Sequence, residues 1–242
     1  MKLGDFSALT FDCYGTLIDW EAGILAGLLP LAARAGNASG DDAILETFAR
    51  HEAAQEAETP DMIYSRLLAV VHGRIAREWG VDADEAEAAR FGGSVPDWPA
   101  FPDSADALRY LKQHFKLGIL SNVDRISFAG SNKRLGVDFD WIMTAEDIGS
   151  YKPSPRNFEY MIETLGRDGY DKGKILHTAE SLFHDHVPAN RFGLASCWIF
   201  RRHDKDGFGA TSRPAEMPRI DFKFTSLGEM AAAHRREMAG GG

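Results

Sequence analysis

Short apolar runs of strand character recur along the chain, and most of them end at a cluster of polar residues. The runs are "ALTF" at 8–11, "KLGIL" at 116–120, "DWIM" at 140–143, "KILHT" at 174–178 and "SCWIF" at 196–200. Their hydrophobicity is continuous rather than alternating, which indicates strands covered on both faces, as in a parallel sheet. Amphipathic segments between the runs read as helices, and Ser104 and Ser154 are suited to be their N-caps. This alternation predicts an α/β fold with a doubly wound, Rossmann-like parallel sheet.

One long segment interrupts the alternation. Residues 20–90 are rich in Ala, Leu, Glu and Arg, carry apolar residues at helical spacing and contain no convincing strand. Because strand 8–11 must pair with strands that come much later, we place this block as a helical cap inserted after the first strand, over the strand ends where α/β sheets bind ligands. The alternative is that its helices merely cover one face of the sheet. We expect a catalytic core formed by residues 1–17 and 98–242, and a cap formed by residues 18–97.

Composition and charge narrow the class of function. The 27 Lys and Arg against 36 Asp and Glu give a formal net charge of -9, which leaves no general attraction to nucleic acid or to an anionic membrane. No apolar run approaches the roughly 20 residues that span a bilayer, and the N-terminus does not resemble a signal peptide. Cys13 and Cys197 lack metal-ligand spacing and are expected to be buried free thiols. We expect a cytoplasmic enzyme or binding protein with neither nucleic acid nor membrane as partner.

Acid, hydroxyl or amine side chains follow four of the expected strands. They are Asp12 and Thr16, then Ser121 and Asn122, then Lys152, and finally Glu180, Ser181 and Asp185. In a parallel sheet the carboxyl ends of the strands lie on one edge, so these side chains are expected to converge there. Any single one would more often be a helix cap or part of a turn. Four groups in register with four strands favour an active site.

Four segments resemble, in order and spacing, the motifs of the haloacid dehalogenase superfamily. They are "FDCYGTLID" at 11–19, "LSNVD" at 120–124, "YKPSPRNF" at 151–158 and "HDHVPANRFGL" at 184–194. The "DxYGTL" form is similar to the L-2-haloacid dehalogenase branch, whose members hydrolyse carbon–halogen bonds beside a carboxylate through an aspartyl ester. The resemblance implies a hydrolase that converts a short 2-haloacid to a 2-hydroxy acid and halide without a cofactor. Related enzymes are often dimers, so a homodimer is one expectation.

The resemblance also implies a role for each motif residue. Asp12 would be the nucleophile, Lys152 would keep the neighbouring acids ionised, and Asp185 would orient Lys152 or the hydrolytic water. Further residues are expected to bind the substrate, namely Tyr14, Thr16, Ser121, Asn122, Ser181 and, from the cap, Arg50. Arg50 would assist the departing halide. Its alternative reading is a solvated charge on a helix face.

Tyr14 separates two chemistries on this fold. In the phosphatases of the superfamily the position two residues after the nucleophile is typically a second Asp, which protonates the departing alkoxide. A halide ion is a weak base and leaves without a proton. A chain with Tyr14 therefore lacks the acid that a phosphatase needs at this position. It lacks no group that a dehalogenase needs there. A packing role for Tyr14 beneath the cap is compatible with this hypothesis.

The chain departs from the dehalogenase pattern at several positions. Phe158 stands where those enzymes carry Tyr, and Ala179, Glu180 and Ser181 stand where a Ser and an Asn are expected. The substrate carboxylate or the water site is therefore expected to be built differently. Trp20, just after the first motif, either lines the substrate pocket or belongs to the core.

Two alternatives stay open at this point. A Mg²⁺-dependent phosphatase acting on a small phosphorylated metabolite would use Asp12, Glu180 and Asp185 as hard oxygen ligands. A transition-metal site at "HDH", residues 184–186, is disfavoured because neighbouring side chains point in different directions and no third ligand is evident. The second alternative that stays open, besides the phosphatase, is a non-catalytic binding protein on the same fold.

Overall fold

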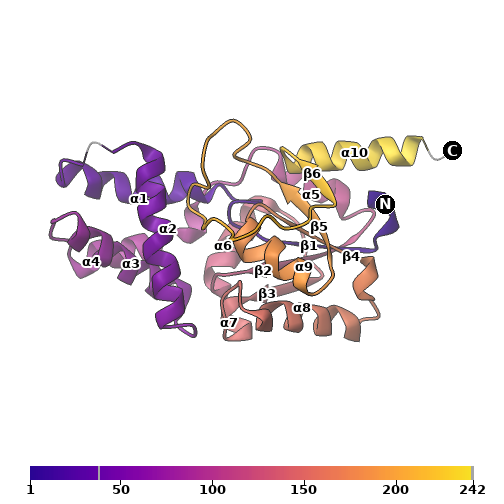
Figure 1. Ribbon diagram of the computed structural model, residues 1–242, viewed down its shortest axis with the longest axis horizontal. Coiled ribbons are helices and arrows are strands. Elements are labelled where there is room, and N and C mark those ends of the chain that lie inside the picture. The colour runs from indigo at the N-terminus through magenta and orange to yellow at the C-terminus, as the bar shows by residue number, and fades with distance from the viewer. Residues whose placement is uncertain (38, 241–242) are drawn as a thin grey trace.

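A computed structural model describes residues 1–37 and 39–240 and contains one six-stranded sheet. All neighbouring strands are parallel, and their order is β3-β2-β1-β4-β5-β6. The strands are β1 (Ala8–Phe11), β2 (Lys116–Ser121), β3 (Trp141–Thr144), β4 (Ile175–Ala179), β5 (Ala195–Ile199) and β6 (Phe222–Phe224). Each apolar run of the sequence forms a strand, so the expected doubly wound parallel sheet is confirmed (Figure 1).

The first strand lies at the centre of the sheet, between β2 and β4. In the register Phe11 stands opposite Ile119 of β2 and opposite Thr178 of β4. The chain runs outward from β1 through β2 to β3 and then returns to β4 on the other side of β1. The strand order reverses at this point, and ligands of open α/β sheets bind at such a switch point, beyond the carboxyl ends of the strands. Asp12 follows β1 directly at this position.

Helices cover both faces of the sheet. They are α5 (Ser104–Leu111), α6 (Arg125–Leu135), α7 (Ala145–Ile148), α8 (Pro155–Arg167), α9 (Val187–Arg191) and α10 (Leu227–Ala239). Figure 1 shows α8 along one side of the sheet and α5 and α10 along the other. Ser154 stands at the predicted N-cap position of α8, although its side chain makes no capping hydrogen bond. Ser104 is instead the first helical residue of α5, and Asp103 is the N-cap. The Ser104 hydroxyl instead donates to the Leu17 carbonyl at 2.8 Å.

Four further helices lie between β1 and β2 in the sequence. They are α1 (Trp20–Arg34), α2 (Asp41–Glu58), α3 (Tyr64–Glu78) and α4 (Glu85–Gly92). Figure 1 shows this group beside the sheet rather than over its faces, which confirms the expected helical insertion after the first strand. The boundaries at residues 17/18 and 97/98 stay predictions. In residues 1–37 and 39–240, no helix is long and apolar enough to cross a membrane.

The helical insertion packs closely against the segment that leads back to the sheet. Gly23 of α1 lies under the indole of Trp98, and a β-carbon at this glycine would stand 2.3 Å from Trp98 Cγ. Only glycine allows this approach without moving the ring. The core beneath is apolar and includes both cysteines, Cys13 and Cys197, which are free and buried as expected.

Candidate active site

Asp12 is held at the carboxyl end of β1 by contacts to both of its carboxylate oxygens. The Thr16 hydroxyl donates to Oδ2 at 2.8 Å, and the Lys152 ammonium donates to Oδ1 at 2.9 Å. Thr16 is brought back toward Asp12 by the tight turn at Gly15, whose φ of +88° favours glycine. The Asp12 side chain is therefore buried and oriented, with only 6% of the residue exposed.

Lys152 is buried and uses all of its donors inside the protein. Its Nζ donates to Asp12 Oδ1 at 2.9 Å, to Asp185 Oδ1 at 2.8 Å and to the Leu120 carbonyl at 2.9 Å. An ammonium group has three N–H donors, so none is left over. Asn122 fixes the backbone of Lys152, because its Oδ1 accepts from Lys152 N at 2.6 Å and its Nδ2 donates to Lys152 O at 3.0 Å. Burial opposes the charge on Lys152, but Asp12 and Asp185 outweigh it and raise the pKa of the ammonium.

Asp185 belongs to a buried chain of polar groups that extends into the sheet. Its Oδ1 is 2.8 Å from His177 Nε2, and His177 Nδ1 is 2.9 Å from the Thr10 hydroxyl. Burial acts to raise the pKa of Asp185, but Lys152 and His177 overcome it and hold the pKa well below the usual range. Sequence reasoning missed His177, because "KILHT" reads as an apolar strand. A polar residue in the middle of a fully buried strand was the signal that could have revealed it.

The other wall of the same cavity comes from the helical insertion. Glu52 and Glu56 of α2 and Tyr64 of α3 line it together with Asp12 and Lys152. The Tyr64 hydroxyl donates to Glu52 Oε1 at 2.5 Å, and Asn122 Nδ2 donates to Glu56 Oε1 at 3.2 Å. Burial raises the pKa of Glu52 to about 7 and the pKa of Glu56 well above its usual value. The sequence did not predict Glu52 or Glu56 as residues of the site.

Most of the residues expected from the sequence meet in this cavity. Its lining includes Asp12, Tyr14, Ser121, Asn122, Lys152, Ser181, Asp185 and also Trp20. The Ser121 hydroxyl is buried and has no hydrogen-bond partner among the described residues. The Ser181 hydroxyl is engaged, because it accepts from His184 N at 3.0 Å and lies 2.9 Å from the Thr211 hydroxyl.

Tyr14 lines the cavity, but its hydroxyl is bound on the side of α6. The oxygen is 2.8 Å from the Ser131 hydroxyl, and the ring packs edge-on against Trp98 with centroids 5.8 Å apart. Burial raises the pKa of the Tyr14 phenol well above its usual value. Tyr14 is therefore a neutral, packed side chain at the position two residues after Asp12.

The expectation that Arg50 faces the site is wrong. Its guanidinium lies on the surface and makes two contacts to Glu78, at 2.9 and 2.8 Å, and Arg50 is not part of the cavity lining that the structure describes. An α-helix turns by about 100° per residue. Because Glu52 faces the cavity, Arg50 two positions earlier stands on the opposite side of α2. The solvated-charge reading of Arg50 is the correct one.

The three oxygen ligands of the phosphatase alternative do not form one group. Glu180 lines a neighbouring cavity with Arg201 and Arg202, while the Lys152 ammonium stands between Asp12 and Asp185. Within the part of the chain that the structure describes, no group of three or more His, Cys, Asp or Glu side chains is arranged to hold a metal ion. The side chains present at the site therefore do not fit the Mg²⁺ set expected from the sequence.

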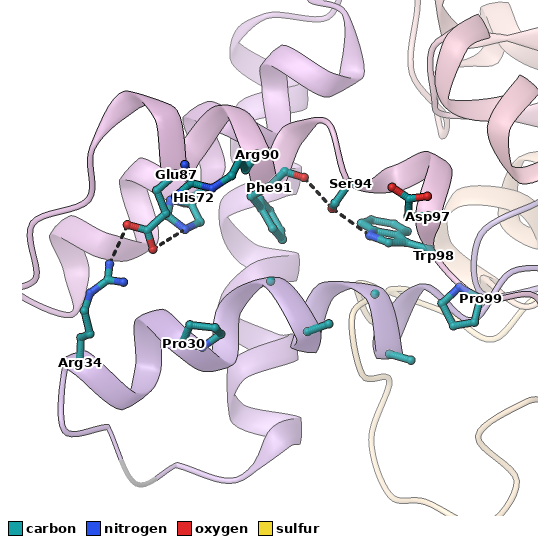
Figure 2. A pocket seen from close by; sticks show the side chains of 14 residues that line it. Pro30, Arg34, His72, Glu87, Arg90, Phe91, Ser94, Asp97, Trp98 and Pro99 are labelled. Carbon is teal, nitrogen blue, oxygen red and sulfur yellow. Dashed lines mark hydrogen bonds and ion pairs between the residues drawn. The ribbon is translucent and has the colours of Figure 1, made fainter.

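A second, larger cavity lies within the helical insertion and carries different side chains. Its volume is about 670 Å³, against about 40 Å³ for the cavity at Asp12. Figure 2 shows it between α1 and the segment that carries Phe91 and Trp98, with Arg34 donating to Glu87 at 2.8 Å across its end. Among the described residues that line it, no carboxylate is held by a lysine. The smaller cavity, with room for about three water molecules, is the candidate active site.

Comparisons with known proteins agree with the α/β fold described above. A family model described as "haloacid dehalogenase-like hydrolase" matches residues 6–177. Among curated proteins, the (S)-2-haloacid dehalogenase of Pseudomonas putida is 29% identical over 127 residues, which are 51% of this chain and 54% of that protein. The pyrimidine 5'-nucleotidase YjjG of Escherichia coli K12 is 24% identical over 141 residues, 56% of this chain and 62% of that protein. The chain thus spans about half the length of the first of these relatives.

Similar folds are found among solved structures. The L-2-haloacid dehalogenase from Xanthobacter autotrophicus with chloropropionic acid covalently bound has a TM-score of 0.77 and 19% identity, and the match covers 95% of this chain and 98% of that one. The defluorinating L-2-haloacid dehalogenase Rha0230 has a TM-score of 0.72 and 24% identity, with 95% of each chain covered. At these identities the likeness concerns the fold alone.

Proposed function

Because the chain belongs to the haloacid dehalogenase-like hydrolase family, whose model matches residues 6–177, we propose that it hydrolyses the carbon–halogen bond of short 2-haloacids or close carbonyl analogues. The reaction passes through an ester on Asp12 and gives a 2-hydroxy product and halide. One observation carries this proposal: Asp12 is buried between Lys152 and Thr16, while Tyr14, two residues later, offers no carboxylic acid. The site thus holds a nucleophile, and Tyr14 stands at the position where the phosphatases of this fold carry the acid for an alkoxide leaving group.

In the first half-reaction an Asp12 carboxylate oxygen attacks carbon 2 of the substrate. The new carbon–oxygen bond forms as the carbon–halogen bond breaks, and the halide leaves with the bonding electrons. Lys152 and Thr16 hold the carboxylate in one orientation, so little reorganisation is needed before attack. The cavity of about 40 Å³ restricts the substrate to a short carbon chain.

In the second half-reaction water attacks Cγ of Asp12 and the ester bond breaks. One proton of the water ends on the 2-hydroxyl group of the product and the other passes to solvent. Lys152 stabilises the negative charge that develops on the Asp12 carboxyl oxygen. Asp185 Oδ2 is buried without a hydrogen-bond partner among the described residues and accepts a hydrogen bond from the attacking water.

A second candidate is a Mg²⁺-dependent phosphatase. It is favoured by the likeness to the nucleotidase YjjG and to a HAD-hydrolase, YfnB, whose structure is described as bound to magnesium. The position of Glu180 and the presence of Tyr14 speak against it. The third hypothesis, a non-catalytic binding protein on this fold, requires that neither halide nor phosphate is released.

A halide-release panel with isotope labelling tests the proposal. We expect chloride or bromide from a 2-halopropionyl compound, and a single turnover in heavy-oxygen water should label the protein at Asp12. Asp12→Asn should abolish release while the fold is retained, because an amide of nearly the same shape is a far poorer nucleophile. Label found only in the product would mean that water attacks the substrate directly, and full activity of a folded Asp12→Asn variant would exclude the ester.

A further inference from the structure

The two carboxylate oxygens of Asp185 have different surroundings. Oδ1 accepts a hydrogen bond from Lys152 Nζ at 2.8 Å and lies 2.8 Å from His177 Nε2. Oδ2 is buried and has no hydrogen-bond partner among the described residues. Asp185 lines the cavity at Asp12. Both neighbours therefore hold the same oxygen, and the second oxygen is left to accept from a molecule in the cavity.

His177 is held in place from inside the sheet. It is fully buried in β4 and stands opposite Thr10 of β1 in the register, with its Nδ1 at 2.9 Å from the Thr10 hydroxyl. An ionised carboxylate only accepts hydrogen bonds, whereas a neutral imidazole has one donor and one acceptor nitrogen. Asp185 therefore selects the tautomer that carries its proton on Nε2. The Thr10 hydroxyl donates to Nδ1 and completes the hydrogen bonds of the ring.

Phe158 of α8 fixes the plane of the imidazole from the side. The two rings pack edge-on with centroids 5.2 Å apart, and Phe158 is fully buried. The dehalogenase pattern carries Tyr at this position, so the chain has no phenol hydroxyl here. His177, in contact with the Phe158 ring, is the polar group of this part of the core. The departure at Phe158 and the unexpected His177 thus form one arrangement that ends on Asp185.

We propose that His177 is a positioning residue for hydrolysis of the Asp12 ester, because its Nε2–H holds Asp185 Oδ1 and thereby directs Oδ2 at the attacking water. The proposal rests on the function proposed above. The water oxygen bonds to Asp12 Cγ as the bond from Cγ to the ester oxygen breaks. One water proton ends on the 2-hydroxyl group of the product, the other passes to solvent, and Asp185 stays ionised. Halide departure needs no water, so His177 acts on the second half-reaction.

Two amide substitutions test this role, because each keeps one contact of the imidazole. In His177→Gln the amide nitrogen reaches the place of Nε2 and still donates to Asp185, whereas the shorter side chain of His177→Asn reaches only Thr10. With (S)-2-chloropropionate, His177→Asn should hydrolyse the ester about tenfold or more slowly, while its first halide leaves within about threefold of the parent rate. Ester should then accumulate on Asp12, and rapid-quench mass spectrometry measures both rates. His177→Gln is the matched control and should behave like the parent.

The tautomer of His177 gives a readout that needs no turnover. Nitrogen NMR of the parent protein without substrate should show a proton on Nε2 and none on Nδ1, with the ring assigned through its contact with Phe158. A proton on Nδ1 overturns the proposal whatever the activity. Equal slowing of both half-reactions in His177→Asn, or parent-like ester hydrolysis, also overturns it and leaves the aspartyl-ester function in place. An Nε2 proton in a protein that releases no halide keeps the contact with Asp185 and removes the dehalogenase function.

Discussion

Lys152 joins two carboxylates that would otherwise repel each other across a buried cavity. Asp12 and Asp185 each lie within 2.9 Å of its ammonium, and the three side chains are almost fully withdrawn from water. Removing one partner of such a group leaves a buried charge without compensation. The charge and orientation of the Asp12 carboxylate therefore depend on Lys152 as much as on the position of Asp12 itself.

Replacing Lys152 with Met should lower the rate of halide release by a factor of about 100 or more, on the order expected when charge stabilisation at a reacting centre is lost. Single-turnover and steady-state rates measure the effect. Lys133→Met on the exposed face of α6 is the matched control and should behave like the parent. Parent-like turnover of the Lys152 variant would remove Lys152 from the mechanism.

The acid limb of the pH profile should lie above the range typical of aspartate. Burial raises the pKa of Asp12, although Lys152 and Thr16 act against this rise. Because only the ionised carboxylate attacks carbon, kcat/KM should fall as the pH drops through this raised pKa. We expect the midpoint above the usual Asp pKa of about 3.9, and at still higher pH in Lys152→Met. A profile that stays flat down to pH 4 would contradict this prediction.

At the scale of elements, the contact between α1 and Trp98 connects the helical insertion to the sheet. The Trp98 indole donates to the Ser94 hydroxyl at 3.0 Å (Figure 2). It also packs against the Tyr14 ring, so it cannot move without disturbing the site. The absence of a β-carbon at Gly23 is what lets the helix approach this ring. The packing of α1 against Trp98 therefore helps to fix the position of the Tyr14 ring.

We expect Gly23→Ala to lower the free energy of unfolding by about 1–3 kcal/mol, the usual cost of overpacking. The added β-carbon would stand 2.3 Å from Trp98 Cγ, which outweighs the higher helix propensity of Ala. Gly73→Ala in α3 is the control. A β-carbon there meets nothing within 4 Å, so this variant should be more stable by about 0.5–1 kcal/mol. Denaturant unfolding measures the free energy of unfolding of both variants. Equal changes in the two variants would show that the Trp98 contact does not restrict the residue at position 23.

At the scale of the whole molecule, the strand order gathers residues from distant parts of the chain. Because β1 lies between β2 and β4, the residues that follow these strands meet at one edge of the sheet. This arrangement belongs to the fold and is compatible with more than one chemistry. The side chains at the edge, not the sheet, distinguish dehalogenation from phosphoryl transfer.

Halide release should therefore persist in excess EDTA, and hydrolysis of p-nitrophenyl phosphate should be negligible with Mg²⁺ present. A phosphatase of this fold needs a cation to offset the phosphate charge and an acid for its leaving group, whereas halide needs neither. Ion chromatography and phosphate assays on the same preparation measure both activities. Phosphate release that vanishes with chelator, without halide from any compound tested, would reverse the order of the two candidates.

The fold could be predicted from the sequence because the signals are local. Continuous apolar runs such as 8–11 and 116–120 can be buried only in a covered sheet, and the helical spacing of residues 20–90 excludes strands there. The convergence of Asp12 and Lys152 followed from the geometry of parallel strands, which places all carboxyl ends on one edge. These features do not depend on how the helices are rotated.

The sequence by itself determined the sheet, the helical insertion and the meeting of Asp12, Lys152 and Asp185. Only the tertiary structure decided which side of α2 faces the cavity, and it turned Glu52 inward and Arg50 outward. It also directed Glu180 to a neighbouring cavity. The physical reason is that the rotation of a helix is set by packing against residues far away in sequence, and α2 has no dominant apolar face to reveal it. The side chains that α2 contributes to the cavity therefore follow from long-range packing.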